Sequence, residues 1–170
     1  MTDSKSITVS RRKFIVFIVF FVTLVIMIFG TWFYVTKYSK KYIKPSFEPM
    51  SISGPVSLEN NQYGYSVTQF SEEYKVGLCG APEASTTSID LYFTNPEDNN
   101  VLLKCLLLDD SGNTIGESGV LNPGTYVQTI NFNNPMSSGY HELTVKVLGF
   151  EPETYFSRGI VHLITRVQIN

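Results

Sequence analysis

Few side chains in this chain of 170 residues could support catalysis or metal binding. It holds two cysteines, Cys79 and Cys105, and two histidines, His141 and His162. The histidines are too few and too far apart for the ligand spacing of a metal site, and alternation around His162 predicts that it points outward from a strand. The sequence contains no G-x-S-x-G turn and no glycine-rich phosphate loop. It therefore predicts a protein that is not an enzyme and that holds no metal or cofactor.

The segment Asp109–Asn113 could hold a calcium ion by residue type. Its order, Asp-Asp-Ser-Gly-Asn, offers carboxylates to calcium, but it lacks the alternating ligands and the distant glutamate of an EF-hand loop. The same residue types favour tight turns. We interpret the segment as the turn of a β-hairpin.

The two cysteines allow two interpretations. Cys105 falls on the inward positions of an alternating strand, and Cys79 precedes the turn residues Gly80 and Pro82. In an exported chain a Cys79–Cys105 disulfide would close a loop of about 25 residues and stabilise the fold by roughly 3 kcal/mol. Alternatively, Cys105 is simply a small buried hydrophobic residue.

Three tyrosines are candidates for a ligand-facing surface: Tyr92, Tyr126 and Tyr140. Exposed aromatic rings in register on one face of a sheet form a stacking platform for sugar rings. The alternative is that these rings pack in the core or along an edge.

Charge divides the chain into two parts. Residues 1–44 hold eight basic residues and one acid, whereas residues 45–170 hold five basic residues and fourteen acids. This asymmetry indicates two environments on one chain. Because phosphate binding needs clustered lysine and arginine, the acidic second part excludes DNA and RNA as partners.

The segment from Phe14 to Val35 contains 22 residues without a charge. As a helix it would be about 33 Å long, enough for a hydrocarbon core of about 30 Å. Its polar interruptions are Thr23 and Thr31, and Trp32 near its end suits the headgroup level. The run is too long for a signal peptide and ends in bulky residues instead of a small-x-small cleavage site. The sequence therefore predicts an uncleaved transmembrane helix in contact with membrane lipid.

The orientation of this helix rests on its basic flanks. Four basic residues lie on each side, so the positive-inside rule alone does not decide. Because the cluster Arg11–Lys13 abuts the helix directly and residues 1–13 form a short tail, we expect a cytoplasmic N-terminus. Residues 36–170 would then lie outside the cell, on a single-pass protein of the cell membrane. The segment Ser10–Ile15 also resembles a twin-arginine export signal, although the apolar run is longer than that pathway tends to use.

Beyond the helix, residues 36–62 lack an apolar period and carry Pro45, Pro49 and Pro55, which predicts an extended stalk. From Tyr63 onward the apolar period is two, and Asn, Asp, Gly and Pro clusters separate the alternating runs. Seven or eight short strands in residues 63–170 predict an all-β antiparallel sandwich with one core.

The second half of the chain combines the patterns N-P-x-x-N, D-D-x-G, E-S-G and L-x-P-G in that order. The matching residues are Asn95, Pro96, Asn99, Asp109, Asp110, Gly112, Glu117, Ser118, Gly119, Leu121, Pro123, Gly124 and Gly139. In these residues the chain resembles a family of small membrane-anchored proteins of Gram-positive bacteria, often carried on conjugative or other mobile elements. The resemblance implies one immunoglobulin-like β-sandwich after an N-terminal anchor and a polar stalk. Tyr140 directly follows Gly139, one residue away from the family's G-x-Y spacing.

These patterns together predict a membrane-anchored extracellular interaction or structural module. We expect it to bind another protein at the cell surface, as an accessory component of a conjugation or secretion apparatus. The alternative is a cell-wall or carbohydrate-binding module that uses Tyr92, Tyr126 and Tyr140.

Overall fold

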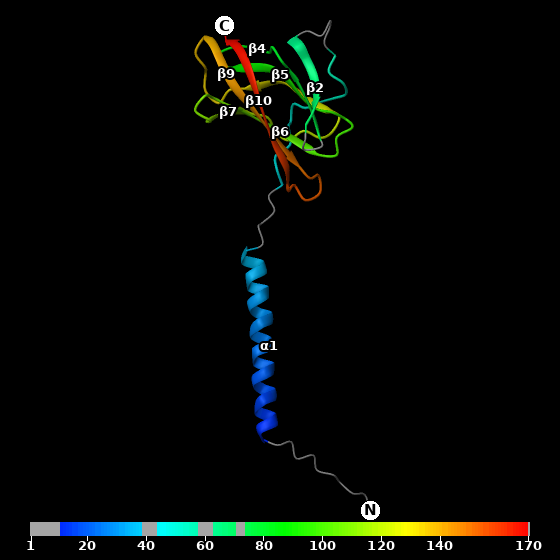
Figure 1. Ribbon diagram of the computed structural model, residues 1–170, viewed down its shortest axis with the longest axis vertical. Helices are drawn as coiled ribbons and strands as arrows, with labels where there is room; N and C mark the ends of the chain where they lie inside the picture. The colour runs from blue at the N-terminus through cyan, green and yellow to red at the C-terminus, as the bar shows by residue number, and fades with distance from the viewer. Residues whose placement is uncertain (1–10, 39–43, 58–62, 71–73, 170) are drawn as a thin grey trace, which may run out of the picture. The chain divides into compact units, whose positions relative to one another are not determined.

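The computed structural model describes residues 11–38, 44–57, 63–70 and 74–169 (Figure 1). The chain divides into two units, Met1–Tyr42 and Ile43–Asn170. The first contains a helix and the second contains the strands. Most of the predicted cytoplasmic tail and parts of the predicted stalk lie outside the described residues.

Helix α1 runs from Arg11 to Tyr38 and contains the whole predicted membrane span. Its stretch Lys13–Tyr34 has a mean hydropathy of 2.9 and is not buried within the protein. The Thr23 hydroxyl donates to the carbonyl of Val19 at 2.8 Å, and the Thr31 hydroxyl bonds the preceding turn in the same way. Neither hydroxyl therefore needs a partner in lipid. The prediction of one N-terminal helix long and apolar enough to cross a membrane is confirmed.

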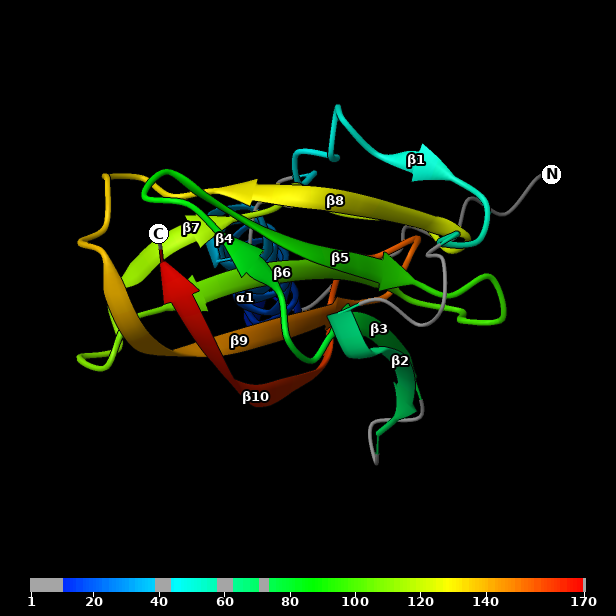
Figure 2. The ribbon, with the colours of Figure 1, turned by 90° about the horizontal axis from the view of Figure 1, so that it is seen from above.

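The second unit is built from strands joined by short turns. The described strands are β1 (Ile52–Ser53), β2 (Tyr65–Gln69), β3 (Lys75–Cys79), β4 (Glu83–Ala84), β5 (Ser88–Asn95), β6 (Leu102–Leu108), β7 (Thr114–Glu117), β8 (Thr125–Asn131), β9 (Gly139–Phe150) and β10 (Ser157–Ile169). They form one curled sheet of two layers (Figure 2). We call β1, β8, β5, β3 and β2 the first layer, and β7, β6, β9 and β10 the second.

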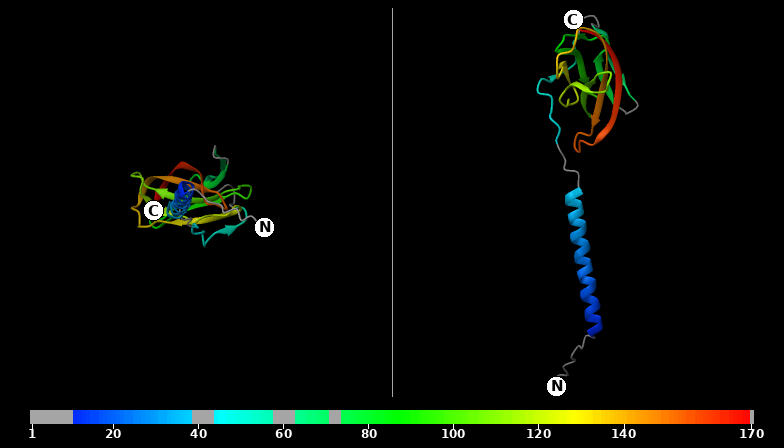
Figure 3. Two further views of the ribbon diagram at one scale, coloured as in Figure 1. Left: turned by 90° about the horizontal axis from the view of Figure 1, so that it is seen from below. Right: turned by 90° about the vertical axis from the view of Figure 1, so that its left-hand side faces the viewer.

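The short strand β4 joins the two layers. It pairs antiparallel with β5 of the first layer and parallel with β10 of the second, where Ala84 faces Ile169. The long β9–β10 hairpin runs the height of the unit (Figure 3). The predicted fold class, an immunoglobulin-like β-sandwich after one N-terminal helix, is confirmed. The β4–β10 pair makes the sheet mixed, whereas the sequence predicted a purely antiparallel one.

The core lies where period-two alternation predicted it. On β5, Ile89, Leu91 and Phe93 are fully buried, whereas the intervening Asp90 and Tyr92 are half-buried. The inward positions of β6, β9 and β10 are buried as well. Their buried residues are Leu103, Cys105, Leu107, Leu143, Val145, Val147, Val161, Val167 and Ile169. Successive side chains of a strand point to opposite faces, so this pattern defines one core between the two layers.

The folded β unit begins before the expected boundary at Tyr63. Strand β1 pairs antiparallel with β8, and Glu48 Oε2 accepts a hydrogen bond of 2.6 Å from the N–H of Gly119. A Cβ on Gly119 would lie 2.5 Å from the Glu48 backbone, so this position requires glycine. Residues 44–57 therefore belong to the β unit. Their prolines resemble a stalk in sequence, because the pairing that holds them is long-range.

The segment Asp109–Asn113 forms the turn between β6 and β7. The Asp109 carboxylate accepts hydrogen bonds from the backbone N–H of Ser111 at 2.9 Å and of Asn113 at 2.8 Å. Gly112 takes the left-handed backbone that the turn requires, with φ of 81°. The interpretation of this segment as a hairpin turn is confirmed.

Candidate functional site

Two of the three predicted ligand-facing tyrosines lie together. Tyr92 on β5 and Tyr126 on β8 stack with ring centroids 6.4 Å apart and planes inclined by 22°. Tyr140 lies on β9 in the second layer, where its side chain is 87% exposed. Tyr92 and Tyr126 are therefore the pair that can act as one surface.

Two tyrosines that sequence reasoning missed lie beside this pair. The Tyr65 hydroxyl on β2 donates to Thr94 Oγ1 at 3.0 Å, and Thr94 is the register partner of Tyr126. Tyr63 hydrogen-bonds to Glu83 on β4. We call Tyr63, Tyr65, Tyr92 and Tyr126 the tyrosine face. The one sequence signal for Tyr63 and Tyr65 is their Tyr-x-Tyr spacing, which lies at the start of β2.

A single cross-strand row of the first layer passes through the tyrosine face. Tyr126 lies in this row, and Tyr65 and Tyr92 lie two residues away from its members Val67 and Thr94. Register partners place five residues in this row, in the order Val67, Gly77, Thr94, Tyr126 and Ile52. Paired residues of a sheet point to the same side. The end residues Val67 and Ile52 are 48% and 44% exposed. The row therefore crosses the whole layer, with exposed apolar residues at its two ends and Gly77 and Thr94 buried at its centre.

Gly77 allows Tyr65 to lie across β3. A Cβ on Gly77 would overlap the Tyr65 hydroxyl and would lie 2.9 Å from Thr94 Cβ. Thr94 faces outward, yet it is buried beneath the neighbouring side chains. Thr94 Oγ1 donates in turn to the carbonyl of Tyr92 at 2.9 Å. A hydrogen-bonded chain from Tyr65 through Thr94 to Tyr92 therefore fixes the centre of the tyrosine face.

Two of the three described non-glycine residues with positive φ lie at this face, and the third, Tyr155, lies between β9 and β10. Tyr63 and Tyr92 are non-glycine residues with positive φ, 62° and 49°. Tyr92 lies in a β-bulge, since the β5–β8 register shifts between Asp90 and Phe93. The left-handed conformation is unfavourable for residues with a Cβ and persists where the surrounding structure enforces it. Such outliers gather at functional sites, so these two tyrosines are marked as functional candidates.

Two carboxylates border the tyrosines. The Glu83 carboxylate accepts the hydrogen bond from Tyr63, which together with burial and the nearby negative charges raises the pKa of the Tyr63 phenol. Burial, followed by the charge of Asp90, raises the pKa of Tyr92. Asp90 itself accepts a hydrogen bond from the Thr129 hydroxyl. These phenols therefore stay neutral at physiological pH and act as apolar rings with hydroxyl donors.

A groove of about 650 Å³ adjoins the tyrosine face. Its lining comes from residues 53–56, from Tyr65 and Val67 on β2, and from residues 94–97 and 123–125 at the ends of β5 and β8. This volume falls within the range of about 300–1,000 Å³ that is typical of ligand sites. The groove and the tyrosine face share Tyr65 and therefore form one continuous surface.

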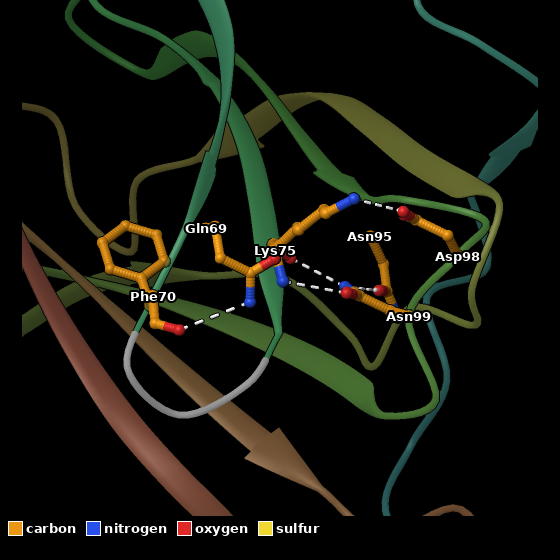
Figure 4. Close-up of polar contacts among 6 residues, drawn as sticks. All are labelled: Gln69, Phe70, Lys75, Asn95, Asp98 and Asn99. Atoms are coloured by element: carbon orange, nitrogen blue, oxygen red, sulfur yellow. Dashed lines mark hydrogen bonds and ion pairs between the residues drawn. The ribbon is translucent and has the colours of Figure 1, made fainter.

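The wall formed by the β5–β6 turn is held by two asparagines (Figure 4). Asn95 is fully buried, and its amide donates to the carbonyls of Val101 at 2.8 Å and Leu121 at 3.0 Å. The Asn99 side chain donates to Asn95 Oδ1 and to the carbonyl of Lys75, both at 2.7 Å, and its Oδ1 accepts from the N–H of Lys75 at 2.8 Å. These bonds satisfy buried polar groups and attach the turn rigidly to β3.

Ion pairs occur in both layers, and Lys75 on β3 of the first layer pairs with Asp98. In the second layer, ion pairs join Lys104 to Glu117, Arg158 to Glu151 and Arg166 to Glu142. Among the described residues, Glu83, Asp90 and Glu97 form no ion pair with a lysine or arginine. The surface around the tyrosine face and its groove is therefore acidic.

Of the two interpretations of the cysteines, the structure fits the one without a Cys79–Cys105 disulfide, and both residues are buried free thiols. Cys105 on β6 packs within the core cluster, and Cys79 lies on β3 of the other layer. The two strands do not pair with each other. Burial raises the pKa of both thiols, for Cys79 to about 11. The alternative interpretation of Cys105, a small buried hydrophobic residue, fits the structure.

The histidines lie apart from the tyrosine face, on β9 and β10. His141 Nε2 donates to the carbonyl of Ser137 at 2.8 Å, and His162 is exposed as predicted. Within the described ranges, no three residues of the His, Cys, Asp and Glu types are grouped to hold a metal ion. The arrangement that the structure does offer is a surface of tyrosines with an adjoining groove and an acidic border.

Comparisons with known proteins do not assign this chain to a family. No protein-family model matches it, and no curated protein matches it. One similar solved structure is that of CopC from Methylosinus trichosporium OB3b, with a TM-score of 0.31 and 17% sequence identity. The similarity covers 52% of this chain and 79% of CopC. A similarity at this level carries no inference about function.

Proposed function

We propose that this protein is a membrane-anchored interaction module that binds another protein through the tyrosine face. The observation that carries the proposal is the gathering of Tyr65, Tyr92 and Tyr126 from three strands, with Tyr63 just before β2, on the outer face of the first layer. Tyrosine is enriched at protein interfaces because its ring offers a large contact area with few rotatable bonds and its hydroxyl retains a hydrogen-bond donor.

The rigidity of the face supports the same function. The bulge at Tyr92 and the hydrogen bonds from Tyr65 through Thr94 hold the rings in place before any partner binds. A surface that is already ordered loses less conformational entropy on binding. The strained backbone at Tyr92 is thus a stability cost that improves binding.

The proposed location follows from helix α1 and its basic flanks. We expect the N-terminus in the cytoplasm and the β unit outside the cell, attached to the membrane through Phe14–Val35. The resemblance to proteins of mobile elements favours a partner within a conjugation or secretion apparatus. Protease added to intact cells is expected to digest the β unit, and complete protection of that unit would contradict this orientation.

Site-specific photo-crosslinking in the cells that naturally contain the protein tests the binding proposal. A photoreactive phenylalanine analogue at position Tyr126 should capture one protein partner. The same analogue at Tyr140, which is 87% exposed in the second layer, is the matched control and should not capture it. Equal capture from both positions, or no protein adduct from Tyr126, would overturn the proposal.

A cell-wall or carbohydrate-binding function is the second candidate. It is favoured by the nearly parallel rings of Tyr92 and Tyr126 and by the adjacent Asp90 carboxylate, which could accept sugar hydroxyls. The full chain in detergent would be tested on peptidoglycan and on glycan arrays. Binding that is lost in Tyr126→Ala but kept in Tyr140→Ala would support this function, whereas no binding on either material would remove it.

A further inference from the structure

We propose that the groove beside the tyrosine face binds an extended segment of the partner protein that carries a lysine or arginine. This inference rests on the proposed function and names the chemistry that the partner presents. The groove is the space of about 650 Å³ lined by residues 53–56, Tyr65, Val67, residues 94–97 and residues 123–125.

The groove is held open by hydrogen bonds on both sides. On one side, the N–H of Gly54 donates to the carbonyl of Gly124 at 3.0 Å, which attaches residues 53–56 to the start of β8. On the other side, the N–H of Gly124 donates to the carbonyl of Asn95 at 2.8 Å, and Asn99 attaches the same turn to β3. A partner therefore meets a groove that is already formed and need not order it.

The lining favours an extended peptide backbone. Pro55, Pro96 and Pro123 contribute rigid apolar rings without N–H groups, and Val56 and Val67 add further apolar surface. Tyr65 adds an aromatic wall. Grooves with aromatic walls bind extended, proline-rich peptide segments. The backbone of such a segment is hydrogen-bonded to water, so the groove need not supply many hydrogen bonds to it.

Charge identifies the side chain that this segment must present. Glu97 lines the groove and, within the described part of the chain, makes no ion pair. The described residues 44–57, 63–70, 74–101 and 122–136 carry five carboxylates and two lysines. Both lysines are already engaged, Lys75 with Asp98 and Lys44 over the ring of Phe47 at 5.6 Å.

A cationic side chain from the partner would thus meet an unopposed carboxylate beside an apolar surface. The excess of acids over bases in residues 45–170 would also steer a basic segment toward the unit. An acidic segment would bring a like charge against Glu97 and is disfavoured by the same argument. The complement of this groove is therefore an extended basic segment.

Peptide binding to the full chain tests this inference. The protein would be placed in nanodiscs of phosphatidylcholine, which has no net charge and does not collect basic peptides. The probes are a short labelled peptide of alternating proline and lysine and its counterpart with glutamate in place of lysine, followed by fluorescence anisotropy. We expect saturable binding of the lysine peptide, weakening with added salt, and much weaker binding of the glutamate peptide.

Variants at Glu97 give the sharper measurement. Glu97→Gln is expected to raise the dissociation constant of the lysine peptide about fivefold, which is the effect of losing one partly exposed ion pair. Glu97→Lys should reverse the preference between the two peptides. Glu142→Lys in the second layer changes the net charge equally and is the matched control, which should keep the original preference. Circular dichroism of each variant checks that the β unit is folded.

Equal binding of both peptides, or equal effects of Glu97→Lys and Glu142→Lys, would overturn the groove proposal. The proposed function has its own readout, which is the partner captured from position Tyr126. If Glu97→Lys leaves this capture unchanged while Tyr92→Ala removes it, the tyrosine face binds the partner and the groove does not. If no partner is captured but the peptide preference reverses with Glu97→Lys, the groove chemistry stands and the proposed function fails.

Discussion

The hydroxyl of Tyr65 on β2 donates a hydrogen bond of 3.0 Å to Oγ1 of Thr94 on β5, across the intervening strand β3. The contact exists because β3 presents Gly77 at the position between them. Any larger residue there would separate the two side chains. The arrangement of the tyrosine face thus depends on a residue that has no side chain of its own.

Gly77→Ala is therefore expected to destabilise the β unit by about 1–3 kcal/mol, the usual cost of overpacking. The new methyl group would overlap the Tyr65 hydroxyl and approach Thr94 Cβ to 2.9 Å. The free energy of unfolding would be measured on the full chain in detergent by urea titration, following the strand signal in circular dichroism.

A double-mutant cycle identifies the cause of this loss. Tyr65→Phe removes the hydroxyl that the methyl group would overlap, so Gly77→Ala should cost less in that background. If Gly77→Ala costs the same in both backgrounds, Tyr65 is not the residue that meets the new methyl group.

The strained backbone of Tyr92 leads to a second prediction. At φ of 49°, glycine avoids the penalty that a Cβ imposes, whereas alanine keeps it. Because both substitutions remove the ring, Tyr92→Gly should be more stable than Tyr92→Ala by about 1 kcal/mol. Both variants should lose partner capture from position Tyr126. At Gln128 on β8, which lacks positive φ, the order should be reversed, with glycine less stable than alanine.

The sequence contained enough information for the membrane helix and for the class of fold. Both rest on local patterns, since an uncharged apolar run and a period of two are visible within a few residues. The alternation of Ile89, Leu91 and Phe93 correctly located the core because the period of two on β5 continues through the bulge at Tyr92. The turn at Asp109 was equally local, since its carboxylate bonds residues two and four positions later.

The tyrosine face could be only half predicted because it depends on register between distant strands. Pairing of Thr94 with both Gly77 and Tyr126 sets the row, and no local pattern specifies this pairing. The same reason left the pairing of the two cysteines open, since alternating strands carry no sign of whether Cys79 and Cys105 will meet. It also explains the early start of the β unit, where Glu48 reaches Gly119.

The two buried thiols should be inert in the folded protein. Burial disfavours the thiolate, and the pKa of Cys79 is raised to about 11, first by burial and then by the charge of Asp90. At pH 8 we therefore expect Cys79 to react with a thiol reagent at least about a hundredfold more slowly than a free cysteine. Cys105→Ala isolates Cys79 for this measurement, and denaturant should expose both thiols in the unmodified chain. A disulfide would instead appear as a mobility change on reduction.

Acid should weaken the β6–β7 turn through Asp109. Hydrogen bonds from the Asn113 side chain and backbone, with those from Ser111 and Gly112, lower the pKa of Asp109 in the folded state. A carboxylate with a lowered folded-state pKa contributes stability above its unfolded pKa of about 3.9, and this contribution is lost as the pH falls through the folded-state value. Asp109→Ala should therefore destabilise the unit at pH 7, and the difference from the unmodified chain should shrink steadily below about pH 4.

Urea titrations of the full chain at several pH values between 7 and 2 would measure this difference. The neighbouring Asp110→Ala is the matched control, because Asp110 accepts none of the hydrogen bonds in the described turn. Its effect should be small and nearly independent of pH. A destabilisation by Asp109→Ala that stays constant down to pH 2 would mean that the turn depends on the shape of the side chain and not on its charge.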